Sequence, residues 1–524
     1  MSVIQAFGGL GLFLLGMIIM TDSLRNLAGD AMRKLLIRFT HTPLSGAVTG
    51  TIATAIMQSS SATTVVAVGL VGAGLMSFAE ALGIIFGANI GTTITGWFVV
   101  LFGFKLQIGT VLMPLILVGA LLRLFAKGRW SSIGMAIAGF GLIFVGIHLI
   151  QQNMFEVQKF VTPENLPDDT FIGRIQLLLI GILFSAVTQS SSAGVAVTLT
   201  ALYAGAINFP QAAALVIGMD VGTTVTAALA TIGGTVGSRR TGLSHVIYNC
   251  FTGLGALLLI TPYVFLWQWL GADILKNNAE IVLIIFHTTF NTLGVMIVLP
   301  LTHQFARMVE YLIPDTEPIY TRSLDKALLH DPGLALTAAQ STLKQESIAL
   351  VRHVIFLLGD MTKGRESNLV ELRNELVKTR SYIDHIDMSS SKVEHHDCFI
   401  NIFHAIDHLQ RLYDRCYEDV DKVTDLKYIE DTELDRKKVA KEFVGLVNDF
   451  ESDNWSAAVE RTDELAKHVT NRVEQLRHNV MKHVAENHIS VARGNASLDA
   501  LRWFGRINNH VERLSYYLRI TTER

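Results

Sequence analysis

Long apolar runs alternate with short polar segments over residues 1–303, whereas residues 336–524 show the periodicity of amphipathic helices. About 20 apolar residues are enough to cross the hydrocarbon core of a bilayer as a helix. Runs of this kind predict membrane spans over residues 3–21, 79–103, 108–126, 132–150, 209–232, 243–266 and 280–301. The expected fold is all-α, with a polytopic membrane domain over 1–303, an ordered linker over 304–335 and a soluble helical bundle over 336–524.

The distribution of charge supports this division. The first 303 residues carry 23 charged side chains, whereas the remaining 221 carry 66. This contrast excludes a wholly soluble enzyme, and a net charge of −3 gives no basis for a nucleic-acid partner, so we expect the lipid bilayer to surround the first domain. The cysteines Cys250, Cys398 and Cys416 form no zinc or CxxC pattern, and we expect neither a disulfide framework nor a structural metal.

Basic residues predict the orientation of the chain in the membrane. They gather after the spans that would run inward: Arg25, Arg33, Lys34 and Arg38, then Lys127 and Arg129, then Arg239 and Arg240, and finally Arg307. Such clusters stay on the cytoplasmic side. We therefore expect an N-terminus outside and a cytoplasmic C-terminal domain, in the inner or plasma membrane. No basic segment precedes the first apolar run, so we expect a retained span there and no cleaved leader.

Two apolar stretches differ from the predicted spans. Residues 39–77 and 175–205 are rich in small residues, which favour close helix packing over contact with lipid. Each contains the sequence Gln-Ser-Ser-Ser at its middle, at positions 58–61 and 189–192. We expect each stretch to form a re-entrant hairpin, the first entered from the cytoplasm and the second from outside.

The two hairpin motifs belong to an internal repeat. The second Gln-Ser-Ser-Ser follows the first by 131 positions, and the stretch Gly218–Thr226 follows its counterpart Gly87–Thr95 by the same distance. The first copy, about residues 1–127, begins with an inward span, and the second, about 132–240, begins with an outward one; further spans occupy 243–301. Inverted-topology repeats of this kind are typical of secondary transporters.

The motifs place suitable chemistry in the membrane. A hairpin that stops at membrane depth leaves free N–H groups that attract anions, and carbonyl and hydroxyl oxygens that coordinate a cation such as Na⁺. Residues 89–93 and 220–224 interrupt their spans with the sequence Asn/Asp-x-Gly-Thr-Thr, and we expect polar breaks there that supply further oxygens. Asp220 is the only acidic residue well inside a predicted span, which makes it a functional candidate.

Two helical pairs, His245 with Asn249 and His287 with Asn291, leave two interpretations open. Histidine and asparagine four residues apart share one helix face. They form hydrogen bonds between helices, or they handle an ion or a proton directly.

These motifs resemble the bacterial form of the type II sodium-dependent phosphate cotransporters, over about residues 1–305. The resemblance implies transport of inorganic phosphate coupled to Na⁺, with no cofactor. It implies that both ligands are held by Gln58, Ser59, Ser60, Ser61, Gln189, Ser190, Ser191 and Ser192. Additional sodium ligands expected from the repeat are Asn89, Thr92, Thr93, Asp220, Thr223 and Thr224. The animal members have asparagine at both repeat positions, so Asp220 is a departure that bears on ion stoichiometry and pH dependence.

The second half resembles the PhoU-like domain, a helical bundle associated with phosphate regulation. Two of its segments, 404–413 and 508–517, are similar to each other. Asp431 and Asp435 have the spacing of metal-binding motifs in that family, although an acidic helix face in water explains them as well. His404 and His408 form either a metal pair or ordinary packing residues. A homodimer is compatible with such a bundle, and the sequence does not decide it.

The sequence therefore predicts a secondary active Na⁺/phosphate transporter that works by alternating access, with a cytoplasmic regulatory bundle. Two alternatives remain: a phosphate-responsive membrane receptor, and an exporter or carrier of another oxyanion such as sulfate or arsenate. The sequence shows no charged clamp that would separate these anions. An enzyme is not expected, because there is no P-loop, no GxSxG and no HExxH motif.

Overall fold

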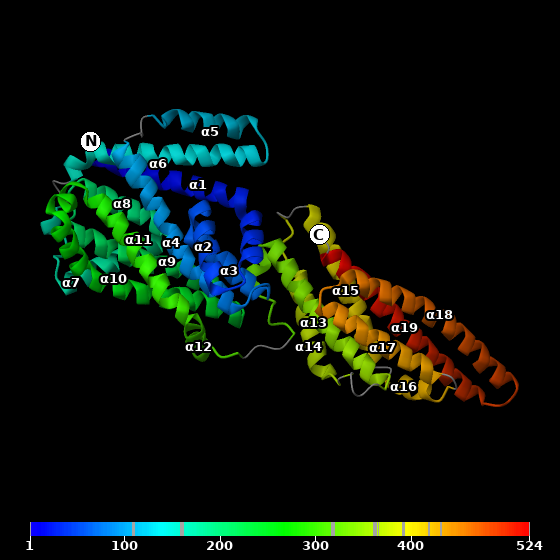
Figure 1. Ribbon diagram of the computed structural model, residues 1–524. Coiled ribbons are helices and arrows are strands. Elements are labelled where there is room, and N and C mark those ends of the chain that lie inside the picture. Colours follow the sequence, from blue (N-terminus) through cyan, green and yellow to red (C-terminus); the bar gives the residue numbers. More distant parts are fainter. Residues whose placement is uncertain are drawn as a thin grey trace. The chain divides into compact units, whose positions relative to one another are not determined.

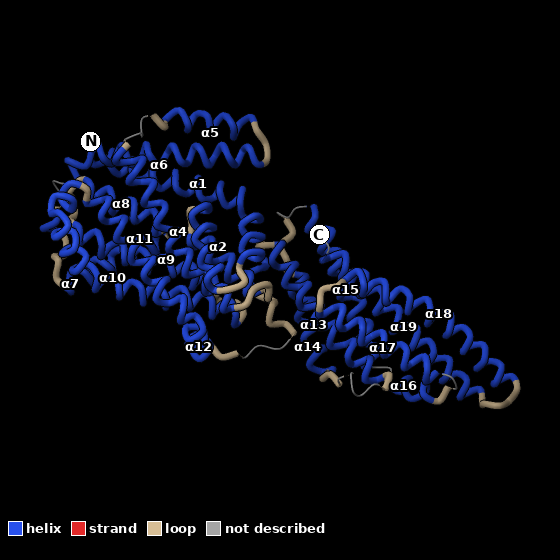
Figure 2. Tube along the Cα trace, in the orientation of Figure 1, coloured by secondary structure: helices blue, strands red, loops and turns tan. Residues whose placement is uncertain are grey.

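The computed structural model describes residues 2–106, 111–157, 162–315, 320–359, 364, 366–389, 393–417, 420–429 and 432–522. Over these residues every regular element is a helix (Figures 1 and 2). Seven of the described helices are long and apolar enough to cross a membrane. The prediction of an all-α, multi-pass membrane protein is therefore confirmed.

The chain divides into two compact units. The first comprises residues 1–71 and 75–315, and the second comprises residues 72–74 and 316–524. The first unit thus extends past the predicted end of the membrane domain at residue 303, and the boundary falls inside the predicted linker. The predicted linker includes most of helix α12 (Thr302–Leu312) and the whole 3₁₀ helix η4 (Lys326–His330).

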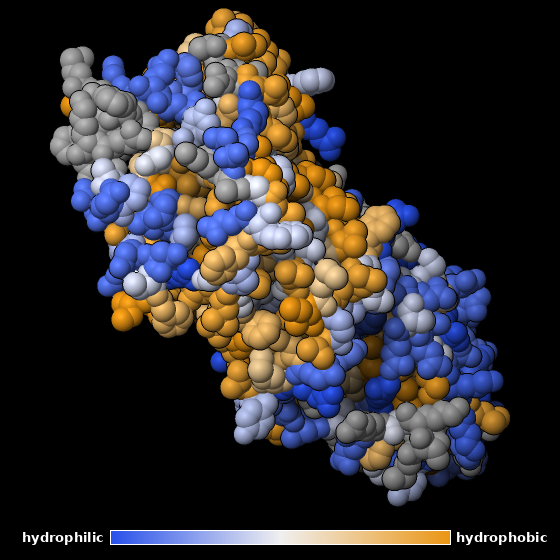
Figure 3. Space-filling view, turned by 60° about the vertical axis from the view of Figure 1, so that its left-hand side comes forward, coloured by the Kyte–Doolittle hydropathy of each residue, from blue (hydrophilic) through white to orange (hydrophobic). Residues whose placement is uncertain are grey.

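The first unit contains the apolar helices. In chain order these are α1 (Ser2–Phe39), α2 (Pro43–Met57), α3 (Ser60–Gly72), α4 (Phe78–Phe98) with its π-helical extension η1 (Val99–Lys105), α5 (Met113–Phe125), α6 (Arg129–Val157), the 3₁₀ helix η2 (Pro163–Asn165), α7 (Phe171–Thr188), α8 (Ser191–Tyr203), α9 (Phe209–Ala230), α10 (Val236–Asn277), α11 (Ala279–Val298) and the 3₁₀ helix η3 (Leu299–Leu301). Many large apolar side chains of this unit are exposed, as expected of a surface that faces lipid; Figure 3 shows hydrophobic residues gathered in a broad band.

Local capping explains where the helices of the two predicted hairpins and their partners begin. The capping residues are Thr42 for α2, Ser77 for α4 and Asn208 for α9. In each case the cap side chain accepts a hydrogen bond from the backbone N–H of the third helical residue, and the side chain of that residue accepts one from the backbone N–H of the cap. Such boxes satisfy backbone N–H groups that the first turn leaves free. The threonine before α7, Thr170, also accepts a bond from a backbone N–H of the first turn.

The polar stretches in α4 and α9 do not break these helices, so the prediction of breaks at residues 89–93 and 220–224 was wrong. Both helices run through without interruption. The reason is that the threonine hydroxyls bond to carbonyls of their own helix: Thr92 to Ala88 at 3.0 Å and Thr224 to Val221 at 2.7 Å. A hydroxyl satisfied in this way can remain in an apolar helix.

The glycines of these stretches let neighbouring helices approach closely. A Cβ atom on Gly91 would lie 2.6 Å from the carbonyl oxygen of Thr51 on α2, and one on Gly222 would lie 2.5 Å from that of Ile182 on α7. These two contacts are related by the same 131-residue offset as the sequence motifs. The pair of α2 with α4 and the pair of α7 with α9 therefore repeat one packing arrangement. Their opposite orientation in the membrane stays a prediction.

Two helices differ from the predicted spans. The helix within predicted span 108–126 is α5, whose described part has 13 residues and is shorter than a typical membrane crossing. Residues 107–110 lie outside the described residues. The helix α7, predicted as half of a hairpin, has 18 residues and is long enough to cross. The α5 helix packs along α6 (Figure 1).

The second unit is a bundle of helices: α13 (Pro332–Leu357), α14 (Leu369–Asp384), α15 (Val393–Tyr417), α16 (Val420–Lys427), α17 (Thr432–Glu451), α18 (Trp455–Ala485) and α19 (Val491–Thr522). Its core is built from one apolar face of each long helix, as the amphipathic pattern predicted; buried examples are Leu343, Leu409, Phe443 and Leu514. The similar segments 404–413 and 508–517 lie on α15 and α19, which pack against each other. His408 and His510 meet there, with 3.2 Å between their Nδ1 atoms.

Candidate functional site

Each Gln-Ser-Ser-Ser motif forms a sharp turn between two helices. Gln58 follows α2 with φ of 54°, and Gln189 follows α7 with φ of 53°, so both glutamines occupy the left-handed region. The next serine accepts a bond from the backbone N–H three residues further on, at 3.2 Å for both Ser59 and Ser190. Each turn therefore joins the carbonyl end of one helix to the capped amide end of the next.

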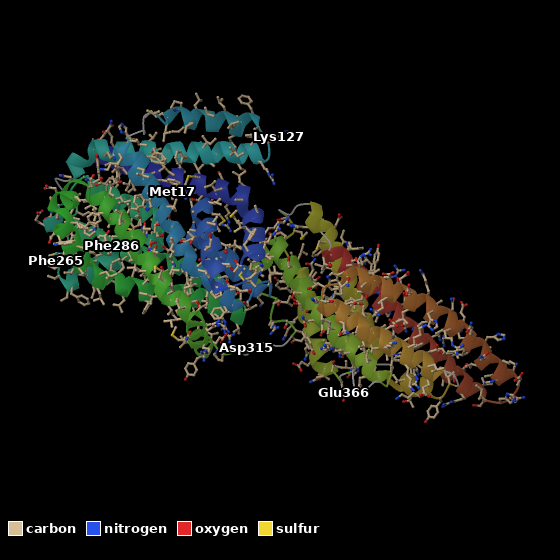
Figure 4. The ribbon with its side chains drawn as sticks, viewed as in Figure 1. Met17, Lys127, Phe265, Phe286, Asp315 and Glu366 are labelled. Carbon is tan, nitrogen blue, oxygen red and sulfur yellow. The ribbon has the colours of Figure 1, made fainter. Side chains whose placement is uncertain are left out.

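Both turns line a single cavity of about 440 Å³ in the first unit. All eight predicted residues contribute to its wall: Gln58, Ser59, Ser60, Ser61, Gln189, Ser190, Ser191 and Ser192. The amide ends of α3 and α8, two 13-residue helices, are thus directed to one space, where their partial positive charge favours an anion. Met17, labelled in Figure 4, belongs to the wall that α1 supplies.

The two glutamines have different surroundings. Gln58 is buried, and its Oε1 atom accepts a hydrogen bond from the Thr95 hydroxyl at 2.9 Å. Gln189 is exposed, and its side chain forms no hydrogen bond with another described residue. The repeat thus has one turn held in place by a side-chain contact and one turn whose amide is free for a ligand.

Only one of the six additional sodium candidates lines the cavity, namely Thr223. The other five, Asn89, Thr92, Thr93, Asp220 and Thr224, are buried in the helices α4 and α9 and do not line the cavity. Their role as sodium ligands stays a prediction.

Asp220 instead joins α9 to α11. Its Oδ2 atom lies 3.0 Å from Nε2 of His287 and accepts a bond from Nδ2 of Asn291, also at 3.0 Å. The pair His287 and Asn291 therefore forms hydrogen bonds between helices, which is the first of the two interpretations above.

Five polar cavity residues were missed by the sequence analysis: Thr21, Asp22 and Arg25 of α1, Thr188 of α7 and Thr226 of α9. Thr226 is the last residue of the repeated stretch, so the repeat itself contained a signal. Arg25 was assigned only to the cytoplasmic end of the first span. The sequence showed no charged clamp for an anion, whereas the structure places two charged residues, Asp22 and Arg25, in the cavity wall.

The bundle shows no group of three or more metal-binding side chains among its described residues. Asp431 lies outside the described residues. Asp435 is buried, and its carboxylate accepts a bond from Nε of Arg472 at 2.9 Å, which satisfies it without a metal. His404 and His408 both stack on Tyr517 of α19, at ring-centroid distances of 4.9 and 5.6 Å. The metal assignment of Asp431 and Asp435 stays a prediction.

Helices of membrane-crossing length around a cavity lined in part by polar side chains define a multi-pass membrane protein with an internal cavity. A sequence model of the Na⁺/Pi-cotransporter family matches residues 12–152 and 167–296, just over half of the chain. The chain belongs to the Na⁺/Pi-cotransporter family. Since this is a family of transporters, the expectation that the protein is not an enzyme is confirmed.

Individual relatives agree with the family. "Uncharacterized protein YqeW" of Bacillus subtilis is 30% identical over 317 residues, which cover 60% of this chain and 99% of the relative. "Putative inorganic phosphate export protein YjbB" of Escherichia coli K12 is 29% identical over 354 residues, which cover 66% of this chain and 63% of the relative. The chain thus spans less than two thirds of YjbB. No solved structure matches the chain.

Proposed function

We propose that the protein carries inorganic phosphate across the membrane together with Na⁺, and that both bind in the cavity between the two Gln-Ser-Ser-Ser turns. The observation that carries this proposal is the meeting of both turns in one cavity. Membership of the Na⁺/Pi-cotransporter family supports phosphate as the cargo and Na⁺ as the coupling ion.

The chemistry of the turns suits both ligands. The amide ends of α3 and α8 and the side-chain amide of Gln189 offer donors to the phosphate oxygens. The last carbonyls of α2 and α7 are acceptors that the helices do not use themselves, and the serine hydroxyls add further oxygens, which are the ligands of hard cations. A bound Na⁺ offsets the repulsion between these oxygens and the phosphate, so each ligand favours the other.

Transport would follow from alternating access around a fixed site. The two helix pairs with repeated packing, α2 with α4 and α7 with α9, are the bodies that would rock against each other. The bundle of the second unit is proposed to act as a PhoU-like regulator on the cytoplasmic side, on the basis of its paired similar segments.

The test uses purified full-length protein in sealed liposomes, with radiolabelled phosphate outside and an imposed Na⁺ gradient. We expect accumulation above equilibrium with Na⁺ and none when K⁺ replaces it. Binding of phosphate without accumulation would instead support a receptor, and uptake independent of Na⁺ would remove the coupling from the proposal.

Export is the second candidate for the direction of transport, because the relative from Escherichia coli is named for phosphate export. The same cavity serves either direction, since alternating access is reversible and the gradients decide the net flux. Loading the liposomes with phosphate and reversing the Na⁺ gradient distinguishes a carrier that works both ways from one that only exports.

A further inference from the structure

The cavity has one wall that the repeated turns do not supply. Helix α1 contributes Leu14, Met17, Ile18, Thr21, Asp22 and Arg25, which recur at intervals of three or four residues and so occupy one face of the helix. The polar end of this face consists of Thr21, Asp22 and Arg25. The second copy supplies no equivalent wall, because its first helix, α6, contributes no residue to the cavity lining. This wall places a cation and an anion beside the serines.

Both charged residues lie inside a helix segment suited to span a membrane. The candidate span of α1 covers Ile4–Gly29. Ionisable groups within such a segment are costly and generally serve a function. Neither Asp22 nor Arg25 forms an ion pair or side-chain hydrogen bond with another described residue, although they are three positions apart on one helix. Their charged groups are therefore available to a ligand.

We propose that Arg25 and Asp22 bind the transported anion directly, and that Asp22 selects oxyanions that carry a proton. This inference rests on the proposed function of the cavity. A guanidinium binds a tetrahedral oxyanion through two parallel N–H bonds and adds the positive charge that helix ends supply only in part. Arg25 thus provides affinity for phosphate.

Asp22 provides discrimination by repulsion. At neutral pH, hydrogen phosphate and hydrogen arsenate each keep a hydroxyl that donates a hydrogen bond to a carboxylate. Sulfate has no proton, so its oxygens meet the carboxylate oxygens as two like charges with no hydrogen bond between them. The site therefore takes phosphate and arsenate and rejects sulfate.

The test measures equilibrium binding of radiolabelled phosphate to the purified full-length protein in Na⁺-containing detergent solution, with unlabelled arsenate or sulfate as competitor. For the wild type we expect arsenate to compete and sulfate to fail even in large excess. Arg25→Gln should raise the dissociation constant for phosphate about tenfold or more, with partial recovery in Arg25→Lys. Asp22→Asn should make sulfate an effective competitor of phosphate, because the neutral amide no longer repels an anion that lacks a proton.

Arg38→Gln is the matched control, because Arg38 lies on the same helix but outside the cavity lining, and its binding should equal that of the wild type. If Arg25→Gln does not fold, as judged by its elution on size exclusion, Arg25→Lys and Asp22→Asn still decide the matter. Two outcomes overturn this inference alone. In the first, the wild type binds phosphate and the Arg25 variants bind it with the same affinity; in the second, Asp22→Asn still excludes sulfate. A wild type that neither binds nor transports phosphate overturns the proposed function and this inference with it.

Discussion

At the scale of single residues, the two turn glutamines share a backbone conformation but differ in the surroundings of their side chains. Both occupy the left-handed region, which costs a side-chain-bearing residue roughly 1–2 kcal/mol relative to the right-handed helix and which glycine adopts freely. Only Gln58 has a side-chain partner, the hydroxyl of Thr95. Substitution by glycine therefore removes the cost of the left-handed conformation at both positions, but it removes a buried hydrogen bond only at Gln58.

We predict that Gln189→Gly abolishes phosphate transport while leaving the melting temperature in detergent equal to or above that of the wild type. Gln58→Gly should also abolish transport but melt below Gln189→Gly, because the buried Thr95 hydroxyl loses its acceptor, at a cost of about 1–3 kcal/mol. The measurements are Na⁺-driven uptake in liposomes and thermal unfolding followed by size exclusion. Normal uptake by Gln189→Gly would exclude its side chain from the binding site.

At the scale of helices, close approach at the repeated glycines holds α7 against α9. A Cβ atom on Gly222 would lie 2.5 Å from a carbonyl oxygen of α7, whereas one on Gly255 of α10 would have nothing within 4 Å. We predict that Gly222→Ala destabilises the protein by about 1–3 kcal/mol, because the helices must separate. Gly255→Ala should be neutral or stabilise by about 0.5–1 kcal/mol through higher helix propensity. Equal melting temperatures for the two variants would show that this packing does not limit stability.

In the bundle, a buried carboxyl makes the stability of α13 and α14 depend on pH. Glu346 is fully buried and its Oε1 atom accepts a bond from the Thr379 hydroxyl at 2.7 Å. Burial raises the pKa of Glu346 from its usual 4.5 to about 8; the Thr379 bond opposes this rise and the nearby Glu375 adds to it. Below about pH 4.5 both the folded and unfolded states hold this proton. Between about 4.5 and 8 only the folded state holds it, so this group's contribution to stability falls as the pH rises through that window.

We predict that Glu346→Gln removes this loss and protects the bundle at pH 8, by an amount on the order of a few kcal/mol, since one pKa unit corresponds to about 1.4 kcal/mol. Hydrogen exchange of peptides from α13 and α14 in the full-length protein measures it, with variant and wild type compared at the same pH. Glu371→Gln, an exposed carboxyl on α14, is the control and should leave exchange unchanged. Equal protection of Glu346→Gln and wild type at pH 8 would mean that Glu346 is ionised in the fold without cost.

The site was predictable from the sequence where a pattern occurs twice. The doubled Gln-Ser-Ser-Ser motif identified both turns, and all eight of its residues line the cavity. The wall from α1 was not predictable, because an arginine near the end of a span is also the signal of membrane orientation and nothing local distinguishes the two roles. The continuity of α4 and α9 was missed for another reason. Polar residues within an apolar run suggest a break in the helix, but the hydroxyls of Thr92 and Thr224 donate hydrogen bonds to carbonyl groups of their own helices.

At the scale of the whole molecule, the path through the membrane depends on which of α5 and α7 crosses it. Either choice gives seven crossings and is compatible with the predicted orientation, in which the N-terminus lies outside and the second unit inside. If α5 crosses and α7 is half of a hairpin, the loop that contains Glu164 lies outside. If α7 crosses and α5 does not, that loop lies in the cytoplasm. The basic residues favour the first path, because Lys127, labelled in Figure 4, and Arg129 lie at the turn between α5 and α6. In addition, α7 packs on α9 in the same way as α2 packs on α4. The helix α7 is therefore the repeat counterpart of α2, which is too short to cross.

We therefore predict that a cysteine at Glu164 is reached from outside the cell. The variants carry Glu164→Cys or Lys467→Cys in a background where Cys250, Cys398 and Cys416 are replaced by serine. Both positions are exposed, and Lys467 lies on α18 of the bundle. A membrane-impermeant maleimide should label Glu164→Cys in intact cells and Lys467→Cys only after the membrane is opened. Labelling of Glu164→Cys only in opened cells would assign the crossing to α7. The two turns would then enter the membrane from the same side. Alternating access between inverted repeats requires entry from opposite sides, so this result would contradict that mechanism.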